Sequence, residues 1–277
     1  MISKIATIAA LTSSAVQAGD YNFWKTKAVY QVLTDRFSQG ASSGGACGNL
    51  SNYCGGTYNG IKDNLDYITG MGFDAIWISP VVDNLDGGYH GYWARNWEKT
   101  NDHFGSSQDL KDLVAACHSK GVAVMVDVVA NHSAPIGDDF GQIYPLNKAE
   151  HYHNDCSIDD WNNQWQVENC RLAGLPDLNQ ENDYVRGYLK DWIKNLVQTY
   201  DFDGVRIDTI PEVEKPFWKE YGDSAGVFQM GEVFNGNSAY VGPYQDYVTG
   251  LFNYPMYFTI KDVYGGGQSM YNIRSRW

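Results

Sequence analysis

Short apolar runs alternate along the chain with longer segments in which apolar residues recur every three or four positions. The short runs are typical of β-strands buried on both faces; they lie at residues 28–33, 73–79, 122–129, 202–208, 227–233 and 250–254. The longer segments have the period of amphipathic helices; they lie at residues 60–71, 106–120 and 183–200. Fully buried strands separated by helices predict a parallel sheet, either doubly wound or most of an eight-stranded barrel. No GxGxxG motif follows the first strand, so the sequence gives no support for a doubly wound sheet of the nucleotide-binding type.

Polar residues gather where the predicted strands end: Asp35, Arg36, Asp127, Asn131, His132, Arg206, Asp208 and Glu232. In a β/α barrel this rim carries the chemistry. Asp208 and Glu232 each end an apolar strand, and two carboxylates facing one substrate can act as nucleophile and general acid. Arg206 precedes Asp208 by two residues, so both point to one face, and the cation favours an ionised Asp208. A purely structural Arg–Asp pair is the alternative interpretation.

Residues 133–181 separate the third strand from its helix and are rich in Asn, Asp, His and Trp. Loops of this length are usually functional or form a small subdomain. We therefore predict a small irregular domain at residues 133–181, inserted into a barrel made from residues 19–132 and 182–277.

The first residues have the features of a secretory signal peptide at residues 1–18: Lys4, an apolar run at 5–11 and a small-x-small site ending at Ala18. An extracellular location follows as an expectation. Five cysteines in a secreted chain predict disulfide pairs and one leftover thiol. Two pairs would close short turn-rich loops, and one cysteine lies on the apolar face of a predicted helix; these are Cys47 with Cys54, Cys156 with Cys170, and Cys117.

The composition narrows the classes of partner. The formal net charge is −13 over 277 residues. Nucleic acids and anionic membranes require a basic surface, so we expect neither as a partner, and no later stretch is long enough to span a bilayer. A neutral substrate and a bound cation remain compatible with this charge.

Six short motifs carry a resemblance to a known family. They are residues 31–37 (QVLTDRF), 89–93 (YHGYW), 127–132 (DVVANH), 175–179 (LPDLN), 204–208 (GVRID) and 231–233 (GEV). With these motifs, which occur in the family's order, the chain resembles the α-amylases of glycoside hydrolase family 13. Within that family it is most similar to the fungal type. One such motif would be weak, whereas six in order make a chance match very improbable.

The resemblance implies a (β/α)8 barrel with a small domain after strand three, and hydrolysis of internal α-1,4-glucosidic bonds with retention. It implies that Asp208 is the nucleophile, that Glu232 is the acid and base, and that Arg206 orients Asp208. The implied partners are starch, glycogen or maltooligosaccharides, bound by a monomer. Further residues are implied to contact the sugar: Gln31, His90, Tyr92, Trp93 and His132.

The resemblance also implies a calcium site. Asn131, Glu168 and Asp177 match ligand positions, and the main-chain carbonyl of Glu212 supplies a fourth oxygen. Oxygen ligands suit a hard cation. Cys170 next to this set matches the family's bridge to Cys156. The ion would join the rim to the inserted domain and stabilise the cleft.

The chain departs from the family pattern in two places. Pro211-Glu212 replaces a Lys-His pair that binds sugar on the leaving-group side, and Glu212 could ligate calcium through its side chain. The family's third catalytic carboxylate, in a His-Asp pair at the end of strand seven, has no counterpart, because neither Asp246 nor Asp262 follows a histidine or ends a convincing seventh strand.

With about six of eight strands, we predict an incomplete barrel that stops before strand seven: a fragment, a truncated gene product, or a chain completed by another polypeptide. The alternative functions are a catalytically impaired glucan-binding homologue, or an α-glucosidase or glucanotransferase of the same family.

Overall fold

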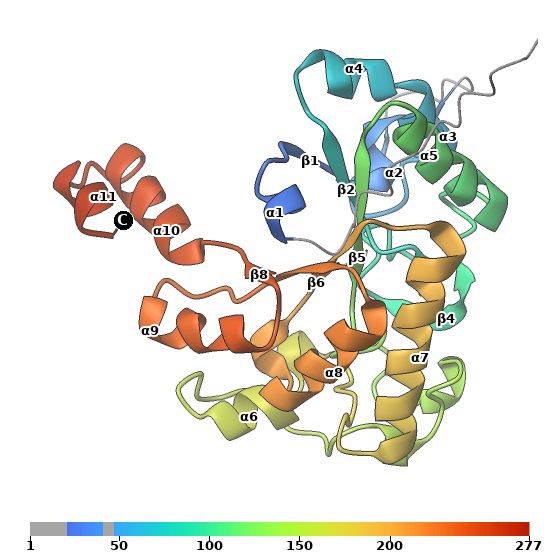
Figure 1. Ribbon diagram of the computed structural model, residues 1–277. Helices are drawn as coiled ribbons and strands as arrows, with labels where there is room; N and C mark the ends of the chain where they lie inside the picture. The colour runs from blue at the N-terminus through green and yellow to red at the C-terminus, as the bar shows by residue number, and fades with distance from the viewer. Residues whose placement is uncertain (1–20, 41–46, 277) are drawn as a thin grey trace, which may run out of the picture.

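The main sheet is parallel and six strands wide. The computed structural model describes residues 21–40 and 47–276, so the predicted signal peptide lies outside the described residues. The sheet order β1–β2–β5–β6–β7–β8 follows the sequence, and the sheet curls as part of a barrel (Figure 1). The predicted incomplete β/α barrel is therefore confirmed. The strands are β1 (Val29–Val32), β2 (Ala75–Ile78), β5 (Ala123–Val128), β6 (Gly204–Ile207), β7 (Phe228–Gly231) and β8 (Gly250–Leu251).

Helices connect these strands and cover the outer side of the curl (Figure 1). Within the described ranges, no helix has both the length and the apolar character needed to cross a bilayer. The α-helices are α1 (Tyr21–Trp24), α2 (Thr34–Phe37), α3 (Tyr58–Asp63), α4 (Leu65–Gly70), α5 (Ser107–Ser119), α6 (Gln164–Asn169), α7 (Asp183–Tyr200), α8 (Lys215–Ala225), α9 (Ser238–Val241), α10 (Tyr254–Tyr264) and α11 (Tyr271–Arg276). Short 3-10 helices are η1 (Phe140–Gln142), η2 (Ala149–His151), η3 (Leu172–Gly174), η4 (Ile210–Glu212) and η5 (Gly242–Asp246).

Strand alternation divides the core into two clusters. Successive side chains of a strand point to opposite faces. On β5, Val124 and Val126 therefore pack into the large core beneath the helices, whereas Ala123 and Met125 point into the curl. The same alternation directs Arg206 of β6 into the curl, at its C-terminal end.

The narrow end of the curl is filled by α1. The indole of Trp24 stacks on Phe228 with ring centroids 5.4 Å apart, and its Nε1 donates to the carbonyl of Asp203. A Cβ atom at Gly204 would lie 2.8 Å from the indole, so a glycine at this inward position of β6 lets α1 approach.

The segment between β5 and α7 contains one α-helix, α6, and three of the 3-10 helices. Two isolated bridges, His132–Asp177 and Tyr152–Leu178, tie its ends together. Its assignment as a separate domain stays a prediction. A second, antiparallel sheet of β3 (Val82–Asn84) and β4 (Ala94–Thr100) lies between β2 and α5 in the sequence and was not predicted.

Both predicted cysteine pairs are disulfides. Cys47 is bonded to Cys54, and Cys156 is bonded to Cys170. Cys117 is free and buried on α5, and Ser106 and Asp109 form a capping box at the start of this helix.

Two predicted elements differ in extent. The helix predicted at 60–71 divides into α3 and α4 at Asn64, whose side-chain amide donates to the carbonyl of Gly60 instead of facing solvent. The strand predicted at 250–254 has only two residues, because Asn253 accepts a hydrogen bond from the main-chain N–H of Met256 and thereby starts α10.

An ion pair at the N-terminal ends of the strands gives a first prediction. His118 Nε2 lies 2.8 Å from Asp203 Oδ2, which raises the pKa of His118, and Asp201 adds to the shift. A raised folded-state pKa stabilises the fold fully below the unfolded value of about 6.5, and this contribution is lost as the pH rises through the folded pKa. We expect a contribution of at most about 1 kcal/mol, since the pair is partly solvated.

Thermal unfolding of the wild type and of His118→Gln at pH 5.5 to 9 checks this prediction. The Tm of the wild type should exceed that of the variant at low pH, and this difference should shrink as the pH rises. Parallel Tm-against-pH curves would show that the ion pair has no such role.

Candidate active site

Two carboxylates lie next to each other at the C-terminal ends of neighbouring strands. β6 and β7 pair in parallel, with Ile207 opposite Gly231. Asp208 and Glu232 each follow directly, and the N–H of Glu232 donates to the carbonyl of Ile207 at 2.9 Å. Because Asp208 is two residues beyond Arg206, both side chains point into the curl.

Arg206 joins the two carboxylates. Its Nη1 donates to Asp208 Oδ1 at 2.7 Å, and its Nη2 lies 2.8 Å from Glu232 Oε2. The arginine is 4% exposed, so this pairing is largely shielded from water. Two carboxylates held by one guanidinium lie close together, and a buried charge-assisted hydrogen bond fixes their positions more firmly than a surface pair. The predicted proximity of Asp208 and Glu232 is therefore seen in the structure.

Asp127 completes the ion cluster from β5. It accepts from Arg206 Nη1 at 2.9 Å, and its Oδ2 accepts from the Tyr92 hydroxyl at 2.8 Å and from Trp77 Nε1 at 3.0 Å. Asp127 is buried, so it cannot meet a substrate, and instead it holds Arg206 in place. The sequence analysis did not assign this role, although an aspartate within an otherwise apolar strand was a signal for a buried partner.

Burial and neighbouring charges shift the pKa of Glu232. Burial raises the pKa of Glu232; Arg206 opposes that rise, and the negative charge of Asp208 adds to it. The hydroxyl of Tyr254 also donates to Glu232 Oε1 at 3.3 Å, a contact that the sequence analysis did not assign. A carboxyl with a raised pKa beside an ionised one is the arrangement that supplies a general acid and a nucleophile.

Four of the predicted sugar-contacting residues form one group, which Tyr92 joins to the ion cluster through its hydrogen bond to Asp127. The rings of His90 and Tyr92 stack with centroids 5.7 Å apart, and Trp93 meets His90 edge to face. Buried His132 lies 3.2 Å from the carbonyl of Tyr92 through Nε2. Burial lowers the pKa of His90 and lowers that of His132 to about 4, so both imidazoles are neutral at neutral pH.

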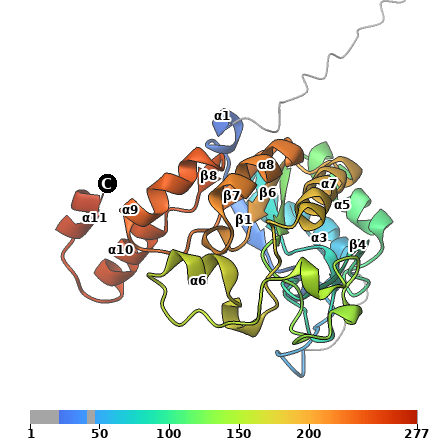
Figure 2. The same cartoon turned by 90° about the horizontal axis from the view of Figure 1, so that it is seen from below.

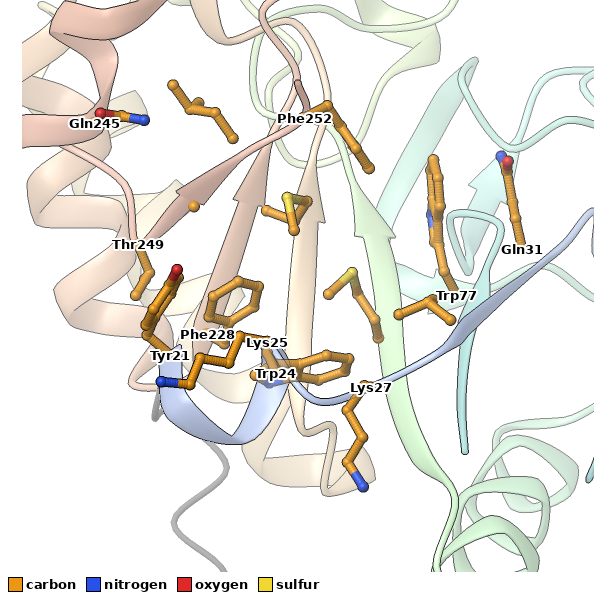
Figure 3. Close-up of a pocket in the computed structure, with 15 residues that line it drawn as sticks. Tyr21, Trp24, Lys25, Lys27, Gln31, Trp77, Phe228, Gln245, Thr249 and Phe252 are labelled. Carbon is orange, nitrogen blue, oxygen red and sulfur yellow. The ribbon is translucent and has the colours of Figure 1, made fainter. Parts of the chain in front are cut away.

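Gln31 lies apart from these four residues. It lies opposite Trp77 in the register of β1 and β2 and lines the cavity inside the curl (Figure 3). No contact described for the chain joins Gln31 to Asp208 or Glu232. Its assignment to the sugar site stays a prediction.

The comparisons with known proteins agree with this geometry. Residues 31–264 match the family described as the α-amylase catalytic domain. The chain belongs to this family. An α-amylase from Schwanniomyces occidentalis is 41% identical over 253 residues, which are 86% of this chain and 49% of that protein. The expected resemblance to fungal α-amylases is confirmed.

Solved structures of α-amylases share the fold. An α-amylase from Malbranchea cinnamomea aligns with a TM-score of 0.87 at 39% identity, covering 92% of this chain and 57% of that one. One from Geobacillus thermoleovorans, complexed with acarbose, aligns with a TM-score of 0.80 at 37% identity, covering 86% and 54%. The chain thus spans about half the length of the curated relatives it matches.

In this α-amylase family member, a cavity of about 290 Å³ lies against Glu232. It is bounded on one side by Trp161 of the inserted segment and on the other by Phe234. Pro211 and Glu212, where the family pattern has Lys-His, line the same cavity. A cavity with aromatic residues and the carboxyl groups of Glu212 and Glu232 in its wall fits a sugar ring, whose C–H faces are apolar and whose rim is hydroxylated.

The predicted calcium ligands meet in part. One terminal atom of the Asn131 amide lies 3.0 Å from both the carbonyl oxygen of Glu212 and Asp177 Oδ1. With the amide oxygen in this position, three oxygens converge, which is the donor set that a hard cation requires. With the amide nitrogen there, the same atoms form two hydrogen bonds. The Glu212 carboxyl is buried, and its Oε2 has no partner among the described residues.

Glu168 is further from this cluster. Its Oε1 accepts from Gln164 Nε2 at 2.9 Å, and the same nitrogen donates to the carbonyl of Pro211 at 3.0 Å. No group of three or more His, Cys, Asp and Glu side chains suited to a metal occurs in the part of the chain that the structure describes. The oxygens that converge are one carboxylate, one amide and one main-chain oxygen, and the calcium site stays a proposal.

Proposed function

We propose that this protein hydrolyses internal α-1,4-glucosidic bonds of starch, glycogen or maltooligosaccharides with retention of configuration. The observation that carries this proposal is the guanidinium of Arg206 between Asp208 and Glu232. A retaining glycosidase needs two carboxyl groups close together on opposite sides of one glycosidic bond, one of them protonated.

The first step forms a covalent glycosyl-enzyme. Asp208 attacks the anomeric carbon while Glu232 transfers its proton to the glycosidic oxygen, which leaves as a hydroxyl. In the second step Glu232 removes a proton from water, the water oxygen attacks the anomeric carbon, and the bond to Asp208 breaks. Arg206 keeps Asp208 ionised and oriented in both steps, and Asp127 keeps Arg206 in position.

The aromatic and imidazole groups would bind the sugar. The face of Tyr92 is suited to the apolar side of a glucose ring, while its hydroxyl is occupied by Asp127. Neutral His90 and His132 can each donate or accept a hydrogen bond from sugar hydroxyls without adding charge. Trp93 would bound the same part of the site.

Release of reducing ends from soluble starch tests the proposal. The purified chain is incubated with starch and calcium, alongside Asp208→Asn and the surface control Glu150→Gln. Starch should be hydrolysed by the chain and by the control, and the Asp208→Asn variant should be inactive. Starch that remains intact with the wild-type chain counts against hydrolysis.

A second candidate is glucan binding without turnover. It rests on the pattern after Glu232, where neither Asp246 nor Asp262 follows a histidine as the family's third carboxylate does. Retention of the chain on an insoluble starch column together with no release of reducing ends would support it. Release of free glucose or of cyclic products would instead indicate an α-glucosidase or a glucanotransferase.

We also propose secretion. The pattern at residues 1–18 and the two disulfides support an extracellular protein, since disulfides persist in oxidising compartments. Expression of the full chain in a yeast and mass spectrometry of the medium should give a mature N-terminus after Ala18.

A calcium site is proposed at Asn131, Asp177 and the carbonyl of Glu212, with Glu168 as a further ligand. When bound there, the ion would supply structural cross-linking between the rim and the inserted segment. The Oε2 atom of the Glu212 carboxyl has no hydrogen-bond partner among the described residues and would add a carboxyl oxygen to the ligand set.

Glu212→Gln is therefore expected to weaken calcium binding by about tenfold, the lower end of the effect of losing a supporting group in a metal site. Calorimetric titration with calcium, and the rise in Tm that calcium produces, measure this directly. Glu150→Gln, on the surface, serves as the matched control. Equal calcium affinity in Glu212→Gln and wild type would exclude its side chain as a ligand.

A further inference from the structure

His90, one of the predicted sugar-contacting residues, lies in a turn whose main chain is weakly restricted. The connection between β3 and β4 places glycines at Gly87, Gly88 and Gly91, on both sides of His90. Gly91 has a φ of 91°, a conformation that glycine adopts without strain. Because the main chain of this turn has little stiffness of its own, the position of the His90 ring depends on the side chains that contact it.

The contacts of His90 fix which of its nitrogens carries the proton. The main-chain N–H of Tyr92 donates to His90 Nδ1 at 3.0 Å. A neutral imidazole that accepts at Nδ1 carries its proton at Nε2. The ring meets Trp93 with centroids 4.8 Å apart and Tyr89 with centroids 5.1 Å apart. His90 therefore has one N–H, at Nε2, that it can donate to a sugar hydroxyl.

Arg36 lies against the face of Tyr89. Its Cζ is 3.8 Å from the centroid of the Tyr89 ring, a distance at which a guanidinium and an aromatic face attract each other. Burial lowers the pKa of His90, and the charges of His132 and Arg36 lower it further. Arg36, Tyr89 and His90 thus form a row of contacting side chains in which the arginine also acts on the imidazole through its charge.

The guanidinium of Arg36 is itself held in place. Its Nε donates to Oδ2 of buried Asp35 at 2.7 Å. Its Nη2 donates to the carbonyls of Leu50 at 2.8 Å and Asn52 at 2.9 Å. Both carbonyls belong to the disulfide loop, residues 47–54, which is closed by a disulfide. Three hydrogen bonds at the edge of a planar guanidinium fix its orientation and leave its face free to stack on a ring.

These contacts belong to the first part of the barrel. Arg36 is on α2, directly after β1, and Tyr89 lies between β3 and β4. Figures 1 and 2 both show β4 and α3 on the side of the molecule away from α10 and α11. None of the contacts described for Arg36, Tyr89 and His90 involves α10 or α11.

We propose that Arg36 is a positioning residue for the sugar site. It joins the disulfide loop to Tyr89, and through Tyr89 it holds the His90 ring in one orientation with the Nε2 proton available to a sugar hydroxyl. The ligand is a glucan, so this role rests on the proposed function. The state of the His90 ring, in contrast, can be measured without any sugar.

Nitrogen NMR of the His90 ring tests the proposal in the absence of substrate. The full chain is labelled with 15N-histidine, and the His90→Gln variant identifies the His90 signals. In the wild type, His90 should be neutral near pH 7 and protonated at Nε2. In Arg36→Met, the two neutral tautomers should mix because the ring is no longer held. The pKa of His90 should also rise, because a positive charge near the imidazole is lost.

Arg186→Met is the matched control. Arg186 likewise pairs with carboxylates, those of Glu214 and Glu220, and its Cζ lies 5.5 Å from the centroid of the Phe217 ring. Its partners lie on α8 or directly before it, away from the turn between β3 and β4. The His90 signals of this variant should match those of the wild type.

Binding of maltoheptaose measures what the orientation of His90 contributes to sugar affinity. Calorimetry is done in the Asp208→Asn background, so that the sugar is not cleaved. Arg36→Met should weaken binding by about two- to tenfold, the effect of losing one hydrogen bond between neutral groups. The same change should add no further loss in a chain that already carries His90→Gln, because Arg36 acts through that ring.

The outcomes separate this proposal from the proposed function. Unchanged His90 signals in Arg36→Met, or strictly additive losses of affinity from Arg36→Met and His90→Gln, would overturn the positioning role. If Arg36→Met does not fold, Tyr89→Leu removes the ring between the arginine and His90, and unchanged tautomers in that variant would overturn the role equally. A chain that shows the expected NMR changes but binds no maltoheptaose would support the link from Arg36 to His90 and count against glucan as the ligand.

Discussion

Glu232→Gln is expected to lose about 10²–10⁴-fold in the rate of starch hydrolysis, the range for removal of a general acid. The amide cannot release a proton to the glycosidic oxygen, whereas it keeps the size of the side chain. Starch binding should persist, because the variant retains the contacts of Glu232 with Arg206 and with the N–H of Thr209 through its amide oxygen.

A substrate with a different leaving group distinguishes a role of Glu232 as the general acid from a purely structural role. A maltosyl fluoride needs no proton to depart, so bond cleavage with it should be nearly as fast in Glu232→Gln as in the wild type. Stopped-flow or fluoride-electrode measurements of the first turnover check this. Equal losses on starch and on the fluoride would show that Glu232 does not act as the acid.

Arg206→Met is expected to lower the free energy of unfolding by about 3–5 kcal/mol, the cost of removing one member of a buried ion cluster. The substitution leaves Asp127, Asp208 and Glu232 close together with no cation between them. Like charges in a shielded site cannot all remain ionised, so one or more would take up a proton.

Urea unfolding of Arg206→Met, of Asp127→Asn and of the double variant measures this coupling. The Asp127→Asn change should cost less in the Arg206→Met background than in the wild type, because the attraction it removes is already gone. Strictly additive losses would mean that Asp127 does not act through Arg206. The Asp127→Asn variant should also hydrolyse starch more slowly at unchanged starch affinity.

Much of the sheet was predictable because its strands are short apolar runs with turn residues between them. The run at 122–129 became β5, and the two-residue spacing of Arg206 and Asp208 placed both side chains on the same face of the sheet, where they form a hydrogen bond. These inferences depend on local periodicity, which the sequence carries directly.

Contacts between residues far apart in the chain were harder to predict from the sequence. Asp127 meets Arg206 only because β5 lies beside β6 with these two residues opposite each other, 79 positions apart in the chain. The packing of Trp24 beneath the curl likewise depends on the absence of a side chain at Gly204. No local pattern reports such contacts, so they required the three-dimensional arrangement.

The family resemblance assigned sugar-contacting roles to residues whose spacing alone indicated no role. In the structure, most of these residues lie close together, but one does not. His90, Tyr92, Trp93 and His132 contact one another and are joined to the ion cluster through Tyr92 and Asp127, whereas Gln31 lies inside the curl, opposite Trp77. A motif preserves the order of residues along the chain, but it does not state which side of a strand faces the substrate.

The most direct test of the central claim is the mass of the peptide that contains Asp208. Glu232→Gln is incubated with maltosyl fluoride, quenched in acid and digested. The first step proceeds without the acid, and the second is slow without the base, so a maltosyl group should accumulate on Asp208. A label on any other residue, or no label under conditions that release fluoride, would contradict the assignment of Asp208 and Glu232 to one sugar-cleaving pocket.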